Sequence, residues 1–365
     1  MVSAVGGRRS DARGRGQDAS TSTLARLVRP SRFSNFQDPV GLLRRAFASG
    51  SRAARLMIVR EIAALALIPL DLGLGLYEER ILERATDRSP QPPIVLIVGP
   101  PRSGTTLAYQ LLAHYLPFSY LDNASSMFPH APITVTQALS RLPNRAPVDT
   151  SSYYGNAAGL RAPNDGFHVW NRWLGEDRYH APSTLAPETS DSMRQFFRAW
   201  FGAFPQPFLN KNNRNSLCLG ALTSELDNVT ALFVKRDPFF VAQSLLKARE
   251  DVQGSRSIGW GALADHSAPV QGSALDDVAE QTHRVFTQMA VAKAALSPEQ
   301  YMEIDYEALC ADPRGLITTL GTRIWGDSLS PRASLDSIVP LPHRDTVRLP
   351  EHEALHLADR INQWR

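Results

Sequence analysis

The chain has 365 residues, of which 43% are hydrophobic and 21% are charged, and its formal net charge is +3. This composition is that of a soluble globular protein, the length suits one α/β domain with insertions, and the small net charge gives no indication of nucleic acid as a partner. The two cysteines, Cys218 and Cys310, lack the spacing of a disulfide framework or of a zinc site, so no metal is expected.

The N-terminal region carries most of the positive charge. Residues 1–55 hold eleven arginines against three aspartates, so the rest of the chain is mildly acidic. Residues 1–23 are rich in glycine, serine and arginine and lack the apolar core of a secretory signal, so we expect a disordered basic arm on a cytoplasmic protein. Such an arm is also suited to an anionic surface, a membrane included.

A helical N-terminal extension with a proline-rich linker is predicted for residues 24–93. Its most apolar part, Leu56–Leu76, is interrupted by Arg60, Glu61 and Asp71, whereas spanning a bilayer takes about twenty apolar residues. We expect an amphipathic or buried helix there, interfacial at most, and peripheral membrane contact through residues 1–76 stays open.

Alternating strands and helices are predicted after the linker. Ile94–Val98 is apolar without period-two alternation, as in a strand of a parallel sheet that is buried on both faces. The further predicted elements are helices at Thr105–Leu116, Asp191–Phe204 and Leu217–Glu225, a strand at Ala231–Val234, helices at Phe239–Glu250 and Ala274–Leu296, a strand from about Tyr301, and a helix at Pro313–Ile324. The fold expected for residues 94–330 is therefore α/β, a P-loop-like parallel sheet flanked by helices, with a C-terminal tail segment at 331–365.

The loop after the first strand, "GPPRSGTT" at Gly99–Thr106, spaces its glycines as a Walker A loop does. Backbone N–H groups of such a loop and of the following helix N-terminus form a nest for an anion. A nucleoside triphosphatase also needs a lysine after the second glycine, and Thr105 stands there instead. With Arg102 as its cation, the loop suits a single phosphate group. The alternative is that the loop is a tight strand-to-helix turn that binds no ligand.

Two further stretches carry candidate anion contacts. In "VKRDPFFVAQSLL", Arg236 ends a strand and Ser244 follows on the next helix, so a guanidinium and a hydroxyl can converge on a second phosphate. The same arginine would equally suit a structural salt bridge. In "FLNKNNRN", Lys211 is one of four lysines beside thirty-five arginines, which favours a role for a compact ammonium over an ordinary surface charge.

Taken in chain order, the loop, the Lys211 stretch and the Arg236 stretch together resemble the sulfotransferase family that uses 3′-phosphoadenosine 5′-phosphosulfate (PAPS). "PRSGTTL" is similar to the loop that binds the 5′-phosphosulfate in tyrosylprotein and many bacterial members, and "EIDYEALCADPRGLITTLG" is similar to the end of the family's domain. The resemblance implies PAPS as co-substrate, transfer of a sulfuryl group to a hydroxyl or amine, and help to the leaving group from Arg102 and Lys211. It implies donor contacts from Arg102, Ser103, Gly104, Thr105, Thr106, Leu107, Arg236 and Ser244.

The general base that removes the acceptor's proton is left open by the sequence. The histidine that follows the lysine in the cytosolic branch of the family is missing from "KNNRN". In the tyrosylprotein branch the general base is a glutamate, and its position in the sequence corresponds to Asp122 or a residue near it. If Asp122 is not the base, it would serve as a turn cap. Asp165 and His168 are the rival candidates, although His168 also suits a core position.

The acceptor would be bound by an insertion at about residues 120–210, where six aromatic residues suggest an apolar or sugar-stacking pocket. These residues are Tyr153, Tyr154, Phe167, Trp170, Trp173 and Trp200. A small molecule, glycan or lipid acceptor is expected, and the arginine bias suggests a bacterial genome. The alternatives are a P-loop nucleotide-binding kinase, or a non-catalytic peripheral membrane protein held by the arm and the 56–76 helix.

Overall fold

The computed structural model describes residues 38–87, 90–140, 152–177, 181–263, 272–343 and 345–364. The chain divides into two compact units, Met1–Asn35 and Phe36–Arg365, and the described residues all belong to the second. The basic arm predicted at 1–23 lies outside the described residues.

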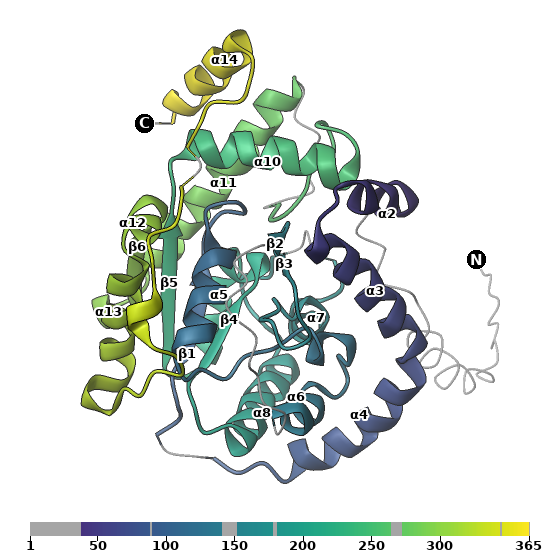
Figure 1. Ribbon diagram of the computed structural model, residues 1–365. Coiled ribbons are helices and arrows are strands. Elements are labelled where there is room, and N and C mark those ends of the chain that lie inside the picture. The colour runs from purple at the N-terminus through teal and green to yellow at the C-terminus, as the bar shows by residue number, and fades with distance from the viewer. Residues whose placement is uncertain are drawn as a thin grey trace, which may run out of the picture. The chain divides into compact units, whose positions relative to one another are not determined.

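A four-stranded parallel sheet forms the centre of this unit (Figure 1). Its strands, in the order in which they pair, are β4 (Phe208–Lys211), β1 (Ile94–Val98), β5 (Val229–Lys235) and β6 (Tyr301–Asp305). Every residue of β1 is buried, as its unbroken apolar run predicts for an inner strand. The predicted parallel α/β fold is confirmed, and β4 is a strand that the sequence pattern did not reveal.

Helices cover both faces of the sheet. Alternate residues of a strand point to opposite faces, and in β1 they enter two different core clusters. Val95 and Ile97 pack under α5 (Thr105–Tyr115) and α13 (Pro313–Trp325). The opposite face packs against α7 (Phe167–Leu174), α8 (Pro187–Ala203), α9 (Leu219–Glu225) and α11 (Ala274–Ala294).

The aromatic residues of α7 and α8 fill this second core. Trp170, Trp173 and Trp200 are at most 5% exposed and pack among Phe196 and Phe197. The expectation that these three tryptophans line an acceptor pocket is therefore wrong, because they are core residues. Their indole N–H groups find partners inside the fold, as for Trp200, which donates to Ser119 Oγ at 2.9 Å.

A third layer of helices lies beyond the carboxyl end of β5. It consists of α10 (Pro238–Gln253), α11 and α14 (Glu351–Asn362), which share one apolar cluster. The segment before α14 is tied to α10, because the Gln243 amide nitrogen donates to Thr346 O at 2.9 Å and its oxygen accepts from Arg348 N at 2.6 Å. The predicted C-terminal tail thus includes a helix that packs on the domain.

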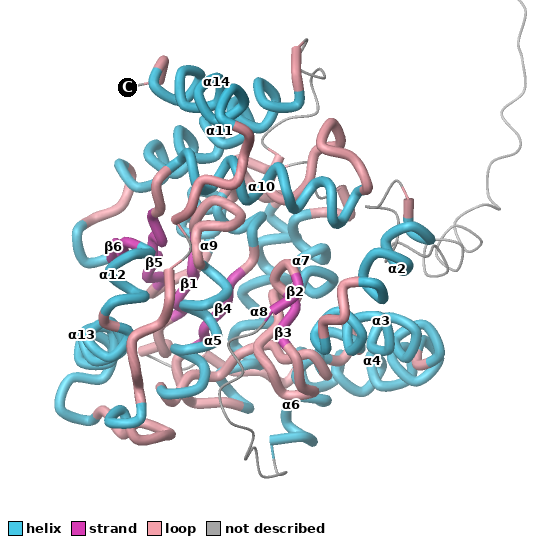
Figure 2. Tube along the Cα trace, turned by 45° about the horizontal axis from the view of Figure 1, so that its top comes forward, coloured by secondary structure: helices cyan, strands magenta, loops and turns pink. Residues whose placement is uncertain are grey.

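The described part of the N-terminal extension contains the helices α2 (Pro39–Ala48), α3 (Arg52–Ala66) and α4 (Ile68–Glu83). The apolar stretch at 56–76 is divided between α3 and α4. In the described parts of the chain, no helix has both the length and the apolarity that crossing a bilayer requires. Smaller elements are η2 (Ser125–Met127), α6 (Pro132–Ser140), β2 (Ser152–Tyr153), β3 (Asn156–Ala157), η3 (Asn213–Ser216), η4 (Pro298–Gln300), α12 (Tyr306–Ala311), η5 (Gly326–Ser328) and η6 (Leu335–Ser337). Figure 2 labels α6, β2, β3 and α12 among them.

Candidate active site

The glycine-bounded loop joins β1 to α5, as the sequence predicts. Gly104 precedes the helix with a φ of 98°, and a Cβ on it would lie 2.4 Å from the ring of Tyr306, so only glycine fits this turn. Ser103 is fully buried, and its hydroxyl has no hydrogen-bond partner within the described residues. A buried hydroxyl without a partner in a loop of this type is suited to binding an anion.

Arg102 is held in an uncommon backbone conformation in this loop. Its φ of 76° lies in the left-handed region, where a non-glycine residue is strained. The side chain donates from Nε to Ser244 Oγ at 3.1 Å, and its guanidinium lies 5.0 Å from the ring centre of Tyr154. The structure therefore brings together Arg102 and Ser244, which are far apart in the sequence.

Lys211 occupies the last position of β4, paired in register with Ile97 of β1. The residue is 5% exposed, and burial lowers the pKa of its ammonium; nearby Arg102 lowers that pKa further, while Asp165 opposes both. A Cβ built on Gly155 would lie 3.7 Å from Lys211 Nζ and 3.9 Å from Thr106 Oγ1. The ammonium and the hydroxyl thus both lie beside the turn between β2 and β3.

The hairpin turn over these two groups is held from both sides. Tyr154 and Gly155 have φ values of 47° and 96°, which suits a tight two-residue hairpin connection. The Tyr154 hydroxyl donates to the carboxylate of Asp251 on α10, and its ring packs edge-on against Trp260. The hairpin was not predicted, and it covers the loop where a phosphosulfate would be expected.

Arg236 reaches the loop from the end of β5. Its NH1 donates to the carbonyl oxygen of Arg102 at 2.9 Å, so the two predicted anion sites are in direct contact. Its guanidinium also lies 4.4 Å from the ring centre of Tyr306. Nε and NH2 both donate to Asp345 Oδ1, at 3.1 and 2.7 Å, and this ion pair is the salt bridge that the sequence left open as the alternative role.

The three candidates for the general base have different surroundings. Asp122 is buried; its Oδ1 accepts from Ser125 N at 2.8 Å, its Oδ2 lies 3.6 Å from Arg161 Nε, and burial raises its pKa. These are the contacts of a turn cap. Asp165 is half-buried, near enough to Lys211 to influence its pKa, and its Oδ1 accepts from Phe167 N at 3.4 Å. His168 is half-buried in the first turn of α7, 5.3 Å from the Phe167 ring.

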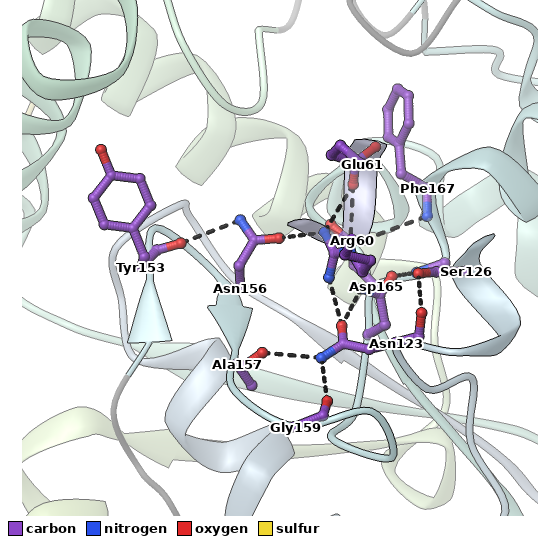
Figure 3. A network of polar contacts seen from close by, with 12 residues as sticks. Arg60, Glu61, Asn123, Ser126, Tyr153, Asn156, Ala157, Gly159, Asp165 and Phe167 are labelled. Atoms are coloured by element: carbon purple, nitrogen blue, oxygen red, sulfur yellow. Dashed lines mark hydrogen bonds and ion pairs between the residues drawn. The ribbon is translucent and has the colours of Figure 1, made fainter. Parts of the chain in front are cut away.

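The N-terminal extension adds an arginine that sequence reasoning did not select. Arg60 of α3 donates to Asn123 Oδ1 at 2.5 Å and to Asn156 Oδ1 at 2.8 Å, and pairs with Glu61 (Figure 3). Asn123 in turn donates to the carbonyl oxygens of Ala157 and Gly159. This network ties α3 to the β2–β3 hairpin, and its partners lie too far apart in the chain for a motif to show it.

The remaining predicted donor contacts belong to the loop and the first turn of α5. Thr105 is buried, Thr106 is half-buried, and Leu107 packs against the core cluster under the helix. The glycine-bounded loop, Lys211, Arg236 and Ser244 thus converge at the carboxyl ends of the strands, where parallel α/β sheets bind their ligands.

Comparison with known proteins identifies the family of this chain. The chain matches the model of the family described as "Sulfotransferase family" over residues 93–324, more than half of its length. A search of the curated proteins finds no match. Among solved structures, the chain is similar to sulfotransferase STF9 from Mycobacterium avium, with a TM-score of 0.50, 12% identity, and coverage of 94% of this chain and 88% of that one. Sulfotransferase STF1 from Mycobacterium tuberculosis H37Rv matches with a TM-score of 0.47, 13% identity, and coverage of 93% and 91%.

At this identity, the likeness to STF9 shows the fold alone, and the family model carries the assignment by matching the sequence itself. The matched range begins just before β1 and ends near the end of α13, so it contains the loop, Lys211, Arg236 and Ser244. The chain belongs to the sulfotransferase family.

Proposed function

We propose that the protein transfers a sulfuryl group from PAPS to a hydroxyl or amine of a small-molecule, glycan or lipid acceptor. The observation that carries the proposal is that a buried ammonium and a loop hydroxyl lie beside the same turn: Lys211 Nζ and Thr106 Oγ1 are both within 4 Å of one Cβ position on Gly155. A glycine-bounded loop with this cation and without a Walker lysine suits a phosphosulfate better than a triphosphate with Mg²⁺.

The donor's two ends would be bound by two groups of residues that contact each other through Arg102. Arg102, Lys211 and the backbone N–H groups of residues 103–106 would contact the 5′-phosphosulfate, and Arg236 with Ser244 would contact the 3′-phosphate. During transfer the bond between sulfur and the bridging oxygen breaks while the acceptor oxygen or nitrogen bonds to sulfur. The cations would stabilise the negative charge that develops on the leaving phosphate.

Asp165 is the carboxylate that we propose as general base, ahead of Asp122. Asp165 lies near enough to Lys211 to raise the pKa of its ammonium. In Asp122, by contrast, one carboxylate oxygen accepts a hydrogen bond within its turn and the other pairs with Arg161. Asp165→Asn should leave bisphosphate binding intact and slow turnover by about 10²–10⁴. Asp122→Asn should mainly lower the melting temperature. A fall in turnover for the folded Asp122→Asn protein alone would reverse this assignment.

Calorimetric titration with adenosine 3′,5′-bisphosphate, and with ATP–Mg²⁺ as the control, tests the donor. Binding of the bisphosphate without binding of ATP–Mg²⁺ supports the sulfotransferase proposal. Binding of ATP–Mg²⁺ alone would favour the P-loop kinase, and binding of neither would favour a non-catalytic protein. Once the donor is established, acceptors can be screened by transfer of labelled sulfate.

A further inference from the structure

Large apolar side chains are exposed along the N-terminal helices. Ten of the fifteen exposed large hydrophobic residues in the described parts of the chain fall between residues 40 and 77. They are Val40, Leu43, Phe47, Leu56, Val59, Ile62, Ile68, Leu70, Leu76 and Tyr77, here called the α2–α4 apolar face. Soluble proteins rarely expose apolar residues in such a concentration without a partner.

The residues of each helix lie on its outer side. In α3, Leu56, Val59 and Ile62 recur every three residues, whereas the alanines at positions 53, 54 and 64 are buried toward the domain. The three helices follow one another at the right of Figures 1 and 2, and neither view shows another described element outside them. Exposed apolar side chains are thus present on all three of these helices.

The charges beside the α2 and α3 parts of this face are mostly positive, whereas α4 exposes Glu79, Arg80 and Glu83. Between Pro39 and Ala66 the sequence contains five arginines and one acidic residue, Glu61, which is paired with Arg60. Arg44, Arg52 and Arg55 are exposed beside the apolar residues. The preceding residues 1–37 add seven arginines against two aspartates. We infer that the α2–α4 apolar face docks on the surface of an anionic lipid bilayer, with its apolar side chains in the interface and the arginines at the headgroups.

A second copy of the chain is the other occupant to consider, and the charges disfavour it. In a two-fold symmetric dimer the same patch meets itself, so the arginines would face a second patch in which exposed arginines outnumber exposed acidic residues. A bilayer that contains anionic lipids supplies the missing negative charge. The inner side of α3 carries Arg60 and its network, so docking would bring this wall of the site toward the lipid surface.

Co-sedimentation of the full-length protein with vesicles tests the inference independently of the donor. Vesicles of equimolar phosphatidylglycerol and phosphatidylcholine should bind the protein, and phosphatidylcholine vesicles should bind it much less. The double substitution Val59→Asp with Ile62→Asp should weaken binding by at least about tenfold, because it places two charges in the interface. Val291→Asp on α11 is the matched control, since Val291 is 68% exposed and Val59 is 62% exposed. This control should bind like the wild type.

Several results would overturn the inference. They are failure of the wild type to bind anionic vesicles, full binding by the double variant, or an equal loss in Val291→Asp. If the wild type forms a concentration-dependent dimer in sedimentation velocity and the double variant stays monomeric, the face would instead be assigned to a second copy. If the double variant does not fold, Leu76→Asp on α4 tests the same face with a single charge, and unchanged vesicle binding by it would count against the bilayer.

Discussion

Lys211 combines burial with a cationic neighbour, and both lower the pKa of its ammonium below the usual lysine value of about 10.4. Because the charged form is the one that stabilises a leaving phosphate, turnover should fall on the alkaline side at a lower pH than for an ordinary lysine. Lys211→Met should lower turnover by about 10²–10³ and remove this alkaline limb. Lys293→Met on α11 is the control, and retained turnover in Lys211→Met would exclude the proposed role.

Asp345 competes for the arginine that we assign to the donor's 3′-phosphate. Its Oδ1 takes two N–H bonds from Arg236, and the two side chains are 12% and 8% exposed. A phosphate can replace these bonds only if the carboxylate moves or its repulsion is overcome. Asp345→Asn should therefore bind adenosine 3′,5′-bisphosphate about tenfold more tightly, since a charge-assisted bond is worth roughly 1.5–3 kcal/mol.

Adenosine 5′-monophosphate, which lacks the 3′-phosphate, is the control ligand for Asp345→Asn. Its affinity should not change by calorimetry. Weaker binding of the bisphosphate by the folded variant would instead mean that Asp345 positions Arg236 for the donor. An equal gain for both nucleotides would mean that the effect does not pass through the 3′-phosphate.

At the scale of elements, the β2–β3 hairpin is the cover of the proposed phosphosulfate site. Gly155→Ala would strain a φ of 96° and add a methyl group 3.7 Å from Lys211 Nζ and 3.9 Å from Thr106 Oγ1. Gly159→Ala is the matched control, because Gly159 has a φ of 101° and its Cβ would meet only Ala162 within 4 Å. Both variants should lose similar thermal stability, and Gly155→Ala alone should lose several-fold in bisphosphate affinity. Equal affinities would place the site away from the hairpin.

The elements that the sequence predicts well are those with a strong local pattern. β1 is an unbroken apolar run, and α10 begins at a proline with Asp237 as its cap, so both could be recognised within a few residues. β4 is only four residues long and is followed by a polar segment, so its pattern is too short to be recognised. Arg60 and Asp345 escaped notice for another reason: their partners lie 63 and 109 residues away, and only the folded chain brings them together.

For the molecule as a whole, helices α2, α3 and α4 are part of the same compact unit as the α/β domain. Two buried acidic residues of α4 join them. Asp71 accepts from His130 N at 3.0 Å, and Glu78 accepts from the backbone N–H groups of Ile133 and Thr134 at 3.3 and 2.9 Å. Glu78 thereby caps the N-terminus of α6, where unpaired N–H groups and the helix dipole favour a carboxylate.

Glu78→Ala should destabilise the protein by about 1–3 kcal/mol, because two buried N–H groups lose their acceptor.

Burial raises the pKa of Glu78, so the folded state holds a proton more tightly than the unfolded chain does. Its contribution to stability is therefore present at acid pH and is lost as the pH rises through the raised pKa. Glu78→Gln should flatten this part of the pH dependence of the melting temperature, and the exposed Glu79→Ala should leave it unchanged. A wild-type melting temperature that rises across the same window, by an amount that Glu78→Gln abolishes, would contradict the assigned direction of the shift.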